Sequence, residues 1–94
     1  MNITRVFCVS YDLSKPNRNY NSLYDELKKS KSWWHYLQST WLIFTDESAD
    51  TLAQRLLKHL DKDDSLLVIE VNKDRQGWLP NKAWEWIKDH IDGY

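Results

Sequence analysis

Four ring-bearing side chains follow one another at Trp33, Trp34, His35 and Tyr36, within the stretch KSWWHYLQST. An exposed tryptophan and tyrosine form a stacking surface for nucleic-acid bases, where each stack contributes about 1–3 kcal/mol. Aromatic side chains also concentrate at subunit interfaces, and they fill hydrophobic cores. Three interpretations of this cluster are therefore open: a ligand-stacking surface, a dimer interface and plain core.

Cations and aromatic rings meet again in the stretch DRQGWLPNKAWEWI. Arg75 and Trp78 lie in its loop, and Trp84 falls on the apolar face of the helix that follows, where core is expected. Trp86 points about 200° away from Trp84 around a helix and needs another partner. A guanidinium beside aromatic rings suits a nucleotide better than an apolar ligand. The candidate ligand-binding residues of the whole chain are Tyr11, Lys15, Arg18, Trp34, His35, Tyr36, Ser39, Arg75 and Trp78.

Asp12 lies where the first apolar run ends, at the start of a loop that precedes a helix. A carboxylate in this place can bind a hard divalent cation, or it can accept backbone hydrogen bonds and turn the chain. A bound Mg²⁺ or Mn²⁺ would activate water for phosphodiester cleavage, so Asp12 is the candidate catalytic and metal-binding residue. His35 has no second histidine at metal-ligand spacing, and DKDD at 61–64 lacks the glycine and distal glutamate of an EF-hand loop.

Length and composition predict one soluble domain over residues 1–94. Thirteen basic and fourteen acidic side chains give a net charge of −1, which argues against a generic binder of the phosphate backbone but leaves room for a local basic patch. Cys8 is the sole cysteine, so no internal disulfide can form, and a reducing cytoplasmic setting is expected. The chain lacks a signal-peptide start, and no apolar segment approaches the ~20 residues of a membrane helix.

Strands and helices alternate along the chain and must position these residues. Dense β-branched, aromatic and aliphatic residues predict strands at 3–13, 33–37, 40–44 and 66–71. Apolar residues at helical spacing predict helices from Asn19, behind an N-cap at Ser48, and from Pro80. Their apolar faces carry Tyr20, Leu23, Tyr24 and Leu27, then Leu52, Ala53, Leu56, Leu57 and Leu60, then Ala83, Trp84, Ile87 and Ile91.

The order of these elements predicts an α+β fold, the ferredoxin-like βαββαβ antiparallel sheet with its helices on one face, plus an extra C-terminal helix. If 33–37 is a strand, Trp33, His35 and Leu37 share one face, while Trp34 and Tyr36 share the other. Both faces of a short strand cannot be buried in a small sheet that is covered on one side. We therefore expect Trp34 or Tyr36 at a dimer or ligand surface.

Short motifs in this chain resemble the CRISPR-associated endoribonuclease-like family of small adaptation subunits. The motifs are Tyr11 and Asp12 at the end of the first strand, and YLQSTWLIF with Gln38, Ser39, Trp41 and Leu42, within roughly residues 3 to 71. The resemblance implies a ferredoxin-like fold and a two-fold dimer in which Asp12 of each chain binds one shared divalent metal.

The stretches WWHYL-STWLI and GWLP-AWEWI are similar to those of uncharacterised SinR-like bacterial and phage relatives of that family. The chain departs from the family in two ways. Lys15 and Arg18 stand at looser spacing where an arginine pair is usual, and a tryptophan-rich helix replaces the last strand and tail.

The leading functional hypothesis is a small homodimer that binds nucleic acid or a nucleotide ligand, with or without metal-dependent phosphodiester cleavage through Asp12. One alternative is a non-catalytic binder that sequesters a cyclic or linear nucleotide signal, as in phage counter-defence. Another is a protein-interaction module whose tryptophans are buried against a partner.

Overall fold

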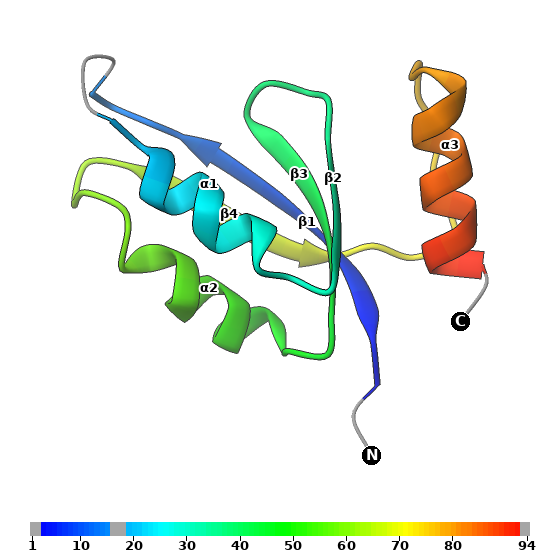
Figure 1. Ribbon diagram of the computed structural model, residues 1–94, viewed down its shortest axis with the longest axis horizontal. Coiled ribbons are helices and arrows are strands. Elements are labelled where there is room, and N and C mark those ends of the chain that lie inside the picture. The colour runs from blue at the N-terminus through cyan, green and yellow to red at the C-terminus, as the bar shows by residue number, and fades with distance from the viewer. Residues whose placement is uncertain (1–2, 16–18, 93–94) are drawn as a thin grey trace.

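An antiparallel sheet of four strands carries the fold (Figure 1). The computed structural model describes residues 3–15 and 19–92 of the chain. The strands lie in the order β2-β3-β1-β4, so that β1 and β3 occupy the centre. They span the following residues: β1 Arg5–Asp12, β2 Ser32–His35, β3 Thr40–Thr45 and β4 Ser65–Glu70. The predicted α+β class with an antiparallel sheet is confirmed.

Two helices connect the strands and a third follows the last one. Helix α1 (Asn21–Lys28) leads from β1 to β2, and α2 (Ala49–Leu57) leads from β3 to β4. Helix α3 (Asn81–Ile87) comes after β4 and continues as a π-helical segment, η1, over Lys88–Asp92. The order of elements along the chain is therefore the predicted one, including the additional C-terminal helix.

Local hydrogen bonds set the ends of these elements. The side chain of Ser48 accepts a hydrogen bond from the backbone N–H of Thr51 at 3.1 Å, so the predicted N-cap of α2 is confirmed. Helix α1 begins at Asn21, later than predicted, because the side chain of Asn19 accepts the N–H of Asn21 at 2.8 Å in a turn before the helix. Strand β2 ends at His35, two residues earlier than predicted.

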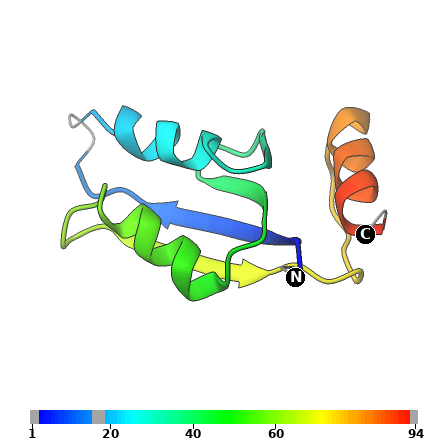
Figure 2. The ribbon, with the colours of Figure 1, turned by 60° about the horizontal axis from the view of Figure 1, so that its bottom comes forward.

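Helices α1 and α2 cover one face of the sheet, and the main hydrophobic core lies between the two layers (Figure 2). Side chains alternate between the faces of a strand, so every second residue of β1 and β3 enters this core. The core residues are Phe7, Val9, Tyr11, Leu23, Leu27, Trp41, Ile43, Leu52 and Leu56. Each large side chain that is fully buried stabilises the fold by about 1.5–3 kcal/mol. Leu57 was predicted for the apolar face of α2, but it is 45% exposed.

Helix α3 lies apart from α1 and α2 (Figures 1 and 2) and contacts the other face of the sheet. The ring of Phe44 in β3 meets the ring of His90 edge-on at 5.0 Å. The indole Nε1 of Trp86 donates a hydrogen bond to Ser32 Oγ in β2 at 3.1 Å, and its ring stacks on His90 at 4.0 Å. Trp86 thus has the separate partner that its position on the helix required. These contacts hold α3 over one end of the second sheet face.

A single carboxylate ties the loop after β1 to the loop before β4. Oδ1 of Asp64 accepts hydrogen bonds from the backbone N–H and the hydroxyl of Ser14 and from the hydroxyl of Tyr20, and Oδ2 accepts the N–H of Asp61, all within 3.0 Å. Desolvation alone would raise the pKa of Asp64, but these four hydrogen bonds lower it to about 2. Within the acidic DKDD segment, Asp64 therefore serves as a hydrogen-bond acceptor that joins two loops.

Arg55 links α2 to α1 and to the residues that follow β3. Its guanidinium bonds Glu26 Oε2 at 3.1 Å, Glu47 Oε1 at 2.8 Å and Ser30 Oγ at 3.0 Å. Burial alone would raise the pKa of Glu26, but hydrogen bonds from Arg55, His59 and Lys29 lower it on balance. The hydrogen bond from Arg55 is the main cause of the lowered pKa of Glu47.

Replacement of Arg55 by alanine should lower the free energy of unfolding by about 2–3 kcal/mol, because two shielded carboxylates lose their charged partner. The control Lys29→Ala removes a lysine that is 69% exposed and should cost less than about 1 kcal/mol. Urea denaturation measures both. Equal losses in the two variants would contradict the account.

The free energy of unfolding of Arg55→Ala should also depend on pH differently from that of the wild type. Because the pKa values of Glu26 and Glu47 are lowered on folding, their contribution is present above the ordinary value of 4.5 and is lost as the pH falls through the lowered values. The free energy of unfolding of Arg55→Ala should therefore fall less steeply below this pH than that of the wild type.

Candidate ligand site between the sheet and the last helix

An apolar cavity of about 220 Å³ lies between the second face of the sheet and α3. We call it the inner cleft. Cys8, Trp34 and Leu42 form its sheet wall, and Trp84 and Ile87 form its helix wall. The three sheet residues belong to three adjacent strands, since Cys8 is paired with Leu42, and Leu42 with Trp34. Burial raises the pKa of the Cys8 thiol, which keeps it protonated at neutral pH.

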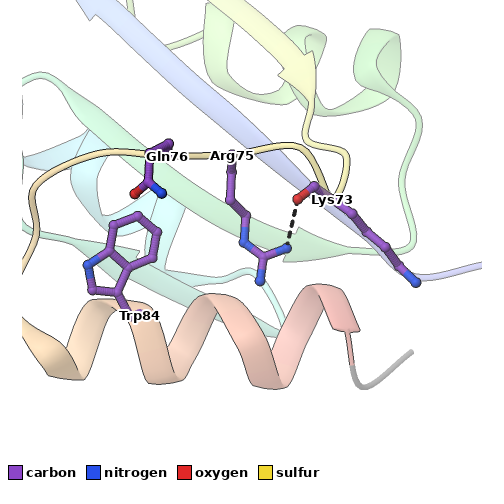
Figure 3. Close-up of a pocket in the computed structure, with 4 residues that line it drawn as sticks. All are labelled: Lys73, Arg75, Gln76 and Trp84. Atoms are coloured by element: carbon purple, nitrogen blue, oxygen red, sulfur yellow. Dashed lines mark hydrogen bonds between the residues drawn. The ribbon is translucent and has the colours of Figure 1, made fainter.

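A wider and more polar hollow of about 630 Å³ lies outside the inner cleft, lined by Lys73, Arg75, Gln76 and Trp84 (Figure 3). We call it the outer basin. Arg75, Gln76 and Trp84 line both compartments, so the basin and the cleft lie next to each other. Figure 3 shows Arg75 and Gln76 extending from the loop toward α3, with Trp84 rising from the helix toward Gln76. A hydrogen bond of 3.2 Å from Arg75 Nη1 to the carbonyl of Lys73 helps to fix the guanidinium.

The loop and the start of α3 hold Trp84 at the junction of the two compartments. Pro80 is in an extended conformation at the N-cap, and its carbonyl accepts the N–H of Ala83 at 3.0 Å. Gly77 lies above the indole: a Cβ added there would be 3.8 Å from the Trp84 ring, an ordinary van der Waals contact. The side chain of Gln76 accepts the N–H of Gly77 at 2.9 Å, which shapes the loop over the ring.

The structure brings two of the predicted ligand-binding residues, Trp34 and Arg75, to the same cavity. Trp33 and Trp34 lie on opposite faces of β2, as predicted. The Trp33 ring is 5.3 Å from the core residue Trp41, whereas Trp34 lines the inner cleft. Leu37 was predicted to share the face of Trp33, but it lines the cleft with Trp34, because β2 ends before it and the chain turns.

Tyr11 lies in the core rather than at a ligand surface. It is 7% exposed, accepts a hydrogen bond from Trp41 Nε1 at 3.0 Å and donates one to the carbonyl of Gln38 at 3.4 Å. Desolvation is the main cause of its raised pKa. We therefore correct its predicted role: its hydroxyl satisfies the buried indole N–H, which would otherwise be left without a partner.

The other predicted residues lie outside the cavity. The ring of His35 stacks on Trp41 at 3.9 Å, on the core side of the sheet. The ring of Tyr36 is tilted against that of Trp34 at 5.7 Å, and Tyr36 remains 59% exposed. Lys15 pairs with Asp61 at 3.2 Å. Two further residues are Ser39, exposed in the turn before β3, and Trp78, 99% exposed in the loop before α3. Arg18 falls outside the described residues.

Asp12 is exposed at the end of β1, in a separate shallow depression that it shares with Ser10, Ser65 and Leu67. Within the part of the chain that the structure describes, no three His, Cys, Asp or Glu side chains gather closely enough to hold a metal ion. Divalent cations of the magnesium type require several oxygen ligands. Among the residues that line this depression, Asp12 alone carries a carboxylate, so a magnesium-type cation there would need further oxygen ligands from water or another molecule.

Sequence reasoning missed Cys8, Lys73 and Gln76 as lining residues, and it expected Trp84 in the core. Trp84 does lie on the apolar side of its helix, but that side faces the second face of the sheet across a cavity. One available signal was the apolar character of Cys8 and Leu42, which occupy strand positions opposite to the core residues.

Comparisons with known proteins support the fold. No family model and no curated protein matches the chain. A solved structure, described as a hypothetical protein TT1823 from Thermus thermophilus, is similar with a TM-score of 0.64 and 23% identity, over 82% of this chain and 93% of that chain. At this identity the likeness shows a shared α+β fold alone. Within the described residues, no helix is long and apolar enough to cross a membrane.

The variant Trp34→Ala should cost less stability than Trp41→Ala. Trp41 is 1% exposed and hydrogen-bonded to Tyr11, so its removal should lower the free energy of unfolding by about 3–5 kcal/mol. Trp34 lines a cavity, so its removal enlarges space that is already empty and should cost less than half as much. Denaturant unfolding compares the two variants. Equal losses would show that Trp34 is a core residue.

Proposed function

We propose that this protein binds a nucleotide, with the base in the inner cleft and the phosphate in the outer basin. One observation carries the proposal: an apolar cleft between two tryptophans, Trp34 and Trp84, lies next to a basin that bears Arg75 and Lys73 and shares three of its lining residues. A nucleotide has the matching parts in the same order, since a flat ring is joined through a sugar to an anion.

The sizes of the two compartments support this orientation. Sites for drug-sized ligands occupy about 300–1,000 Å³. The inner cleft, at about 220 Å³, is smaller and suits a single flat ring system. The outer basin, at about 630 Å³, leaves room for the sugar and phosphate. Base stacking on tryptophan tolerates every base, because each base has a π-face.

The charges at the basin support an anionic group there. A guanidinium can form two parallel hydrogen bonds with phosphate oxygens, and charge-assisted bonds of this kind are about twice as strong as neutral ones. The carbonyl of Lys73 already orients Arg75, so less conformational entropy is lost when an anion binds. Lys73 adds a second positive charge at the edge of the basin.

A free nucleotide fits this chain better than a long nucleic acid strand. RNA-binding sheets of similar topology stack bases on aromatic residues of their central strands. Here the part of the second face beyond the inner cleft presents Ser10 and Asp12, and Ser10 hydrogen-bonds Thr40 of the cleft at 3.3 Å. The carboxylate of Asp12 would repel a phosphate backbone. The net charge of −1 agrees with a small ligand as well.

We further assign the fold as ferredoxin-like. Its support is the arrangement of two strand-helix-strand halves, with β1 and β3 central and with α1 and α2 on one face. The proposed activity is binding without cleavage, because Asp12 lies in a different depression from the cleft and does not fit a metal site by itself. This is the nucleotide-sequestering alternative among the three sequence-based hypotheses.

Calorimetric titration with three related probes tests the proposal. Adenosine 5′-monophosphate should bind, whereas adenosine, which lacks the phosphate, and ribose 5-phosphate, which lacks the base, should each bind at least about tenfold more weakly. The other three ribonucleoside monophosphates test base tolerance. Failure of all four mononucleotides to bind would overturn the proposal.

Two variants locate the binding. Arg75→Gln should weaken the binding of the monophosphate by about tenfold or more and leave the weak binding of adenosine unchanged, because only the phosphate contact is lost. The control Lys58→Gln removes an equal charge from the end of α2, on the opposite face of the sheet. Equal weakening by both variants would mean that net charge, rather than the basin, determines affinity.

A further inference from the structure

Strand β4 has a free edge whose only charged residue is Glu70, at its end. In the described part of the chain, β4 pairs with β1 on one side and is the last strand of the sheet. Its sequence SLLVIE contains no proline and no lysine. Leu67 and Ile69 are 56% and 53% exposed. A long apolar edge of this kind is a template for pairing with another strand.

The hydrogen-bond pattern shows which backbone groups face that edge. The N–H of Val71 donates to the carbonyl of Val6 at 2.8 Å. These two residues are opposite each other when the β1–β4 register is continued by one pair. Bonded pairs alternate with non-bonded pairs in an antiparallel ladder. The N–H and C=O groups of Leu66, Val68 and Glu70 therefore point away from β1.

Two copies of β4 can satisfy these groups in one register. An antiparallel pair centred on Val68 of both copies places Leu66 opposite Glu70, and these are the residues whose backbone groups face outward. Leu67 of one copy then lies opposite Ile69 of the other, and the two side chains are on the same face. The two-fold axis generates this Leu67–Ile69 contact twice, so the exposed leucine and isoleucine of both copies are covered.

The charges that flank β4 favour the same register. Lys62 and Asp63 precede the strand, Lys73 and Asp74 follow it, and all four are exposed. Lys62 and Asp63 lie in a turn before β4, and Lys73 lies at a bend after it, so they are outside the paired strand. The antiparallel arrangement brings the Lys62–Asp63 end of one copy to the Lys73–Asp74 end of the other. Shifting the register by two residues in one direction instead sets Asp64 opposite Glu70, where like charges repel. The chain is thus complementary to itself in charge as well as in backbone pattern.

We propose that two copies of this chain associate through their β4 edges and form one continuous antiparallel sheet. In this dimer the two Asp12 residues are about 25 Å apart, as counted from strand spacing and rise. It therefore differs from a dimer that shares a metal between the two Asp12 carboxylates. The inference rests on the sheet edge and uses no residue of the inner cleft, although Lys73 belongs both to this interface and to the outer basin.

Sedimentation equilibrium of the wild type and of Leu67→Lys/Ile69→Lys tests the interface. The wild type should be a dimer, and the double variant should raise the dissociation constant by at least about tenfold, because lysines then oppose each other across the axis. Both positions are exposed in one copy, so circular dichroism and thermal unfolding should show a folded variant. The control Leu57→Lys alters a leucine on α2 that is 45% exposed and should leave the dimer intact.

A charge exchange tests the register. Lys62→Asp and Asp74→Lys should each weaken the dimer, since each sets like charges together, whereas the double variant should restore it. Dimerisation should also be unchanged by EDTA and by Asp12→Ala. A monomeric wild type, a dimer that survives Leu67→Lys/Ile69→Lys, or a dimer lost with EDTA would each overturn the proposal.

Discussion

A sheet has two faces, and the two connecting helices of this chain cover only one of them. Helices α1 and α2 enclose the core with alternate residues of β1 and β3, and Trp41 lies at its centre with Tyr11 as hydrogen-bond partner. The remaining strand positions must face water, α3 or another molecule. Burial of apolar surface is the largest favourable term in folding, so apolar residues on the second face carry a cost unless something covers them.

The second face meets this constraint in two different ways. At the end near Phe44 and Ser32, contacts with His90 and Trp86 hold the last helix against the sheet. Toward the middle of the face, α3 does not fill the space, and a cleft walled by aromatic rings is left. At β4 no element of the described chain covers the surface. We propose that the cleft in the middle of this face binds a ligand and that the uncovered edge of β4 binds a second copy of the chain.

The ties that fix the first layer are separate from this second face. Asp64 joins loops that are 50 residues apart along the chain through Ser14, and Arg55 joins α2 to α1 over 29 residues through Glu26. Neither residue lines the cleft. The layer that carries the core is therefore stabilised independently of the helix that forms the candidate site, so substitutions in the site and in these ties should act on different properties.

Residue patterns predicted the architecture better than the site. The period-two pattern of β1 and the split of Trp33 and Trp34 depend on neighbours in sequence, so they could be predicted. The cap at Ser48 and the helix start after Pro80 are also local. The role of Tyr11 depends on Trp41, 30 residues away, and no local pattern encodes that contact.

Trp84 illustrates the same limit at the site. Its side of the helix was predictable, but the cavity across from it depends on how closely α3 approaches the sheet. Trp78 lies beside Gly77 in a loop without regular structure, and its exposure is set by the path of the backbone rather than by a pattern of residues.

The central claim is that the space between α3 and the sheet is a ligand site, and the reactivity of Cys8 tests it directly. Cys8 is the sole cysteine and forms part of the floor of the inner cleft. The measurement is the rate of alkylation of the intact protein by N-ethylmaleimide, with and without saturating adenosine 5′-monophosphate. The account predicts that the nucleotide slows the reaction markedly and that ribose 5-phosphate does not. An unchanged rate while the nucleotide is bound would place the ligand elsewhere and contradict the account.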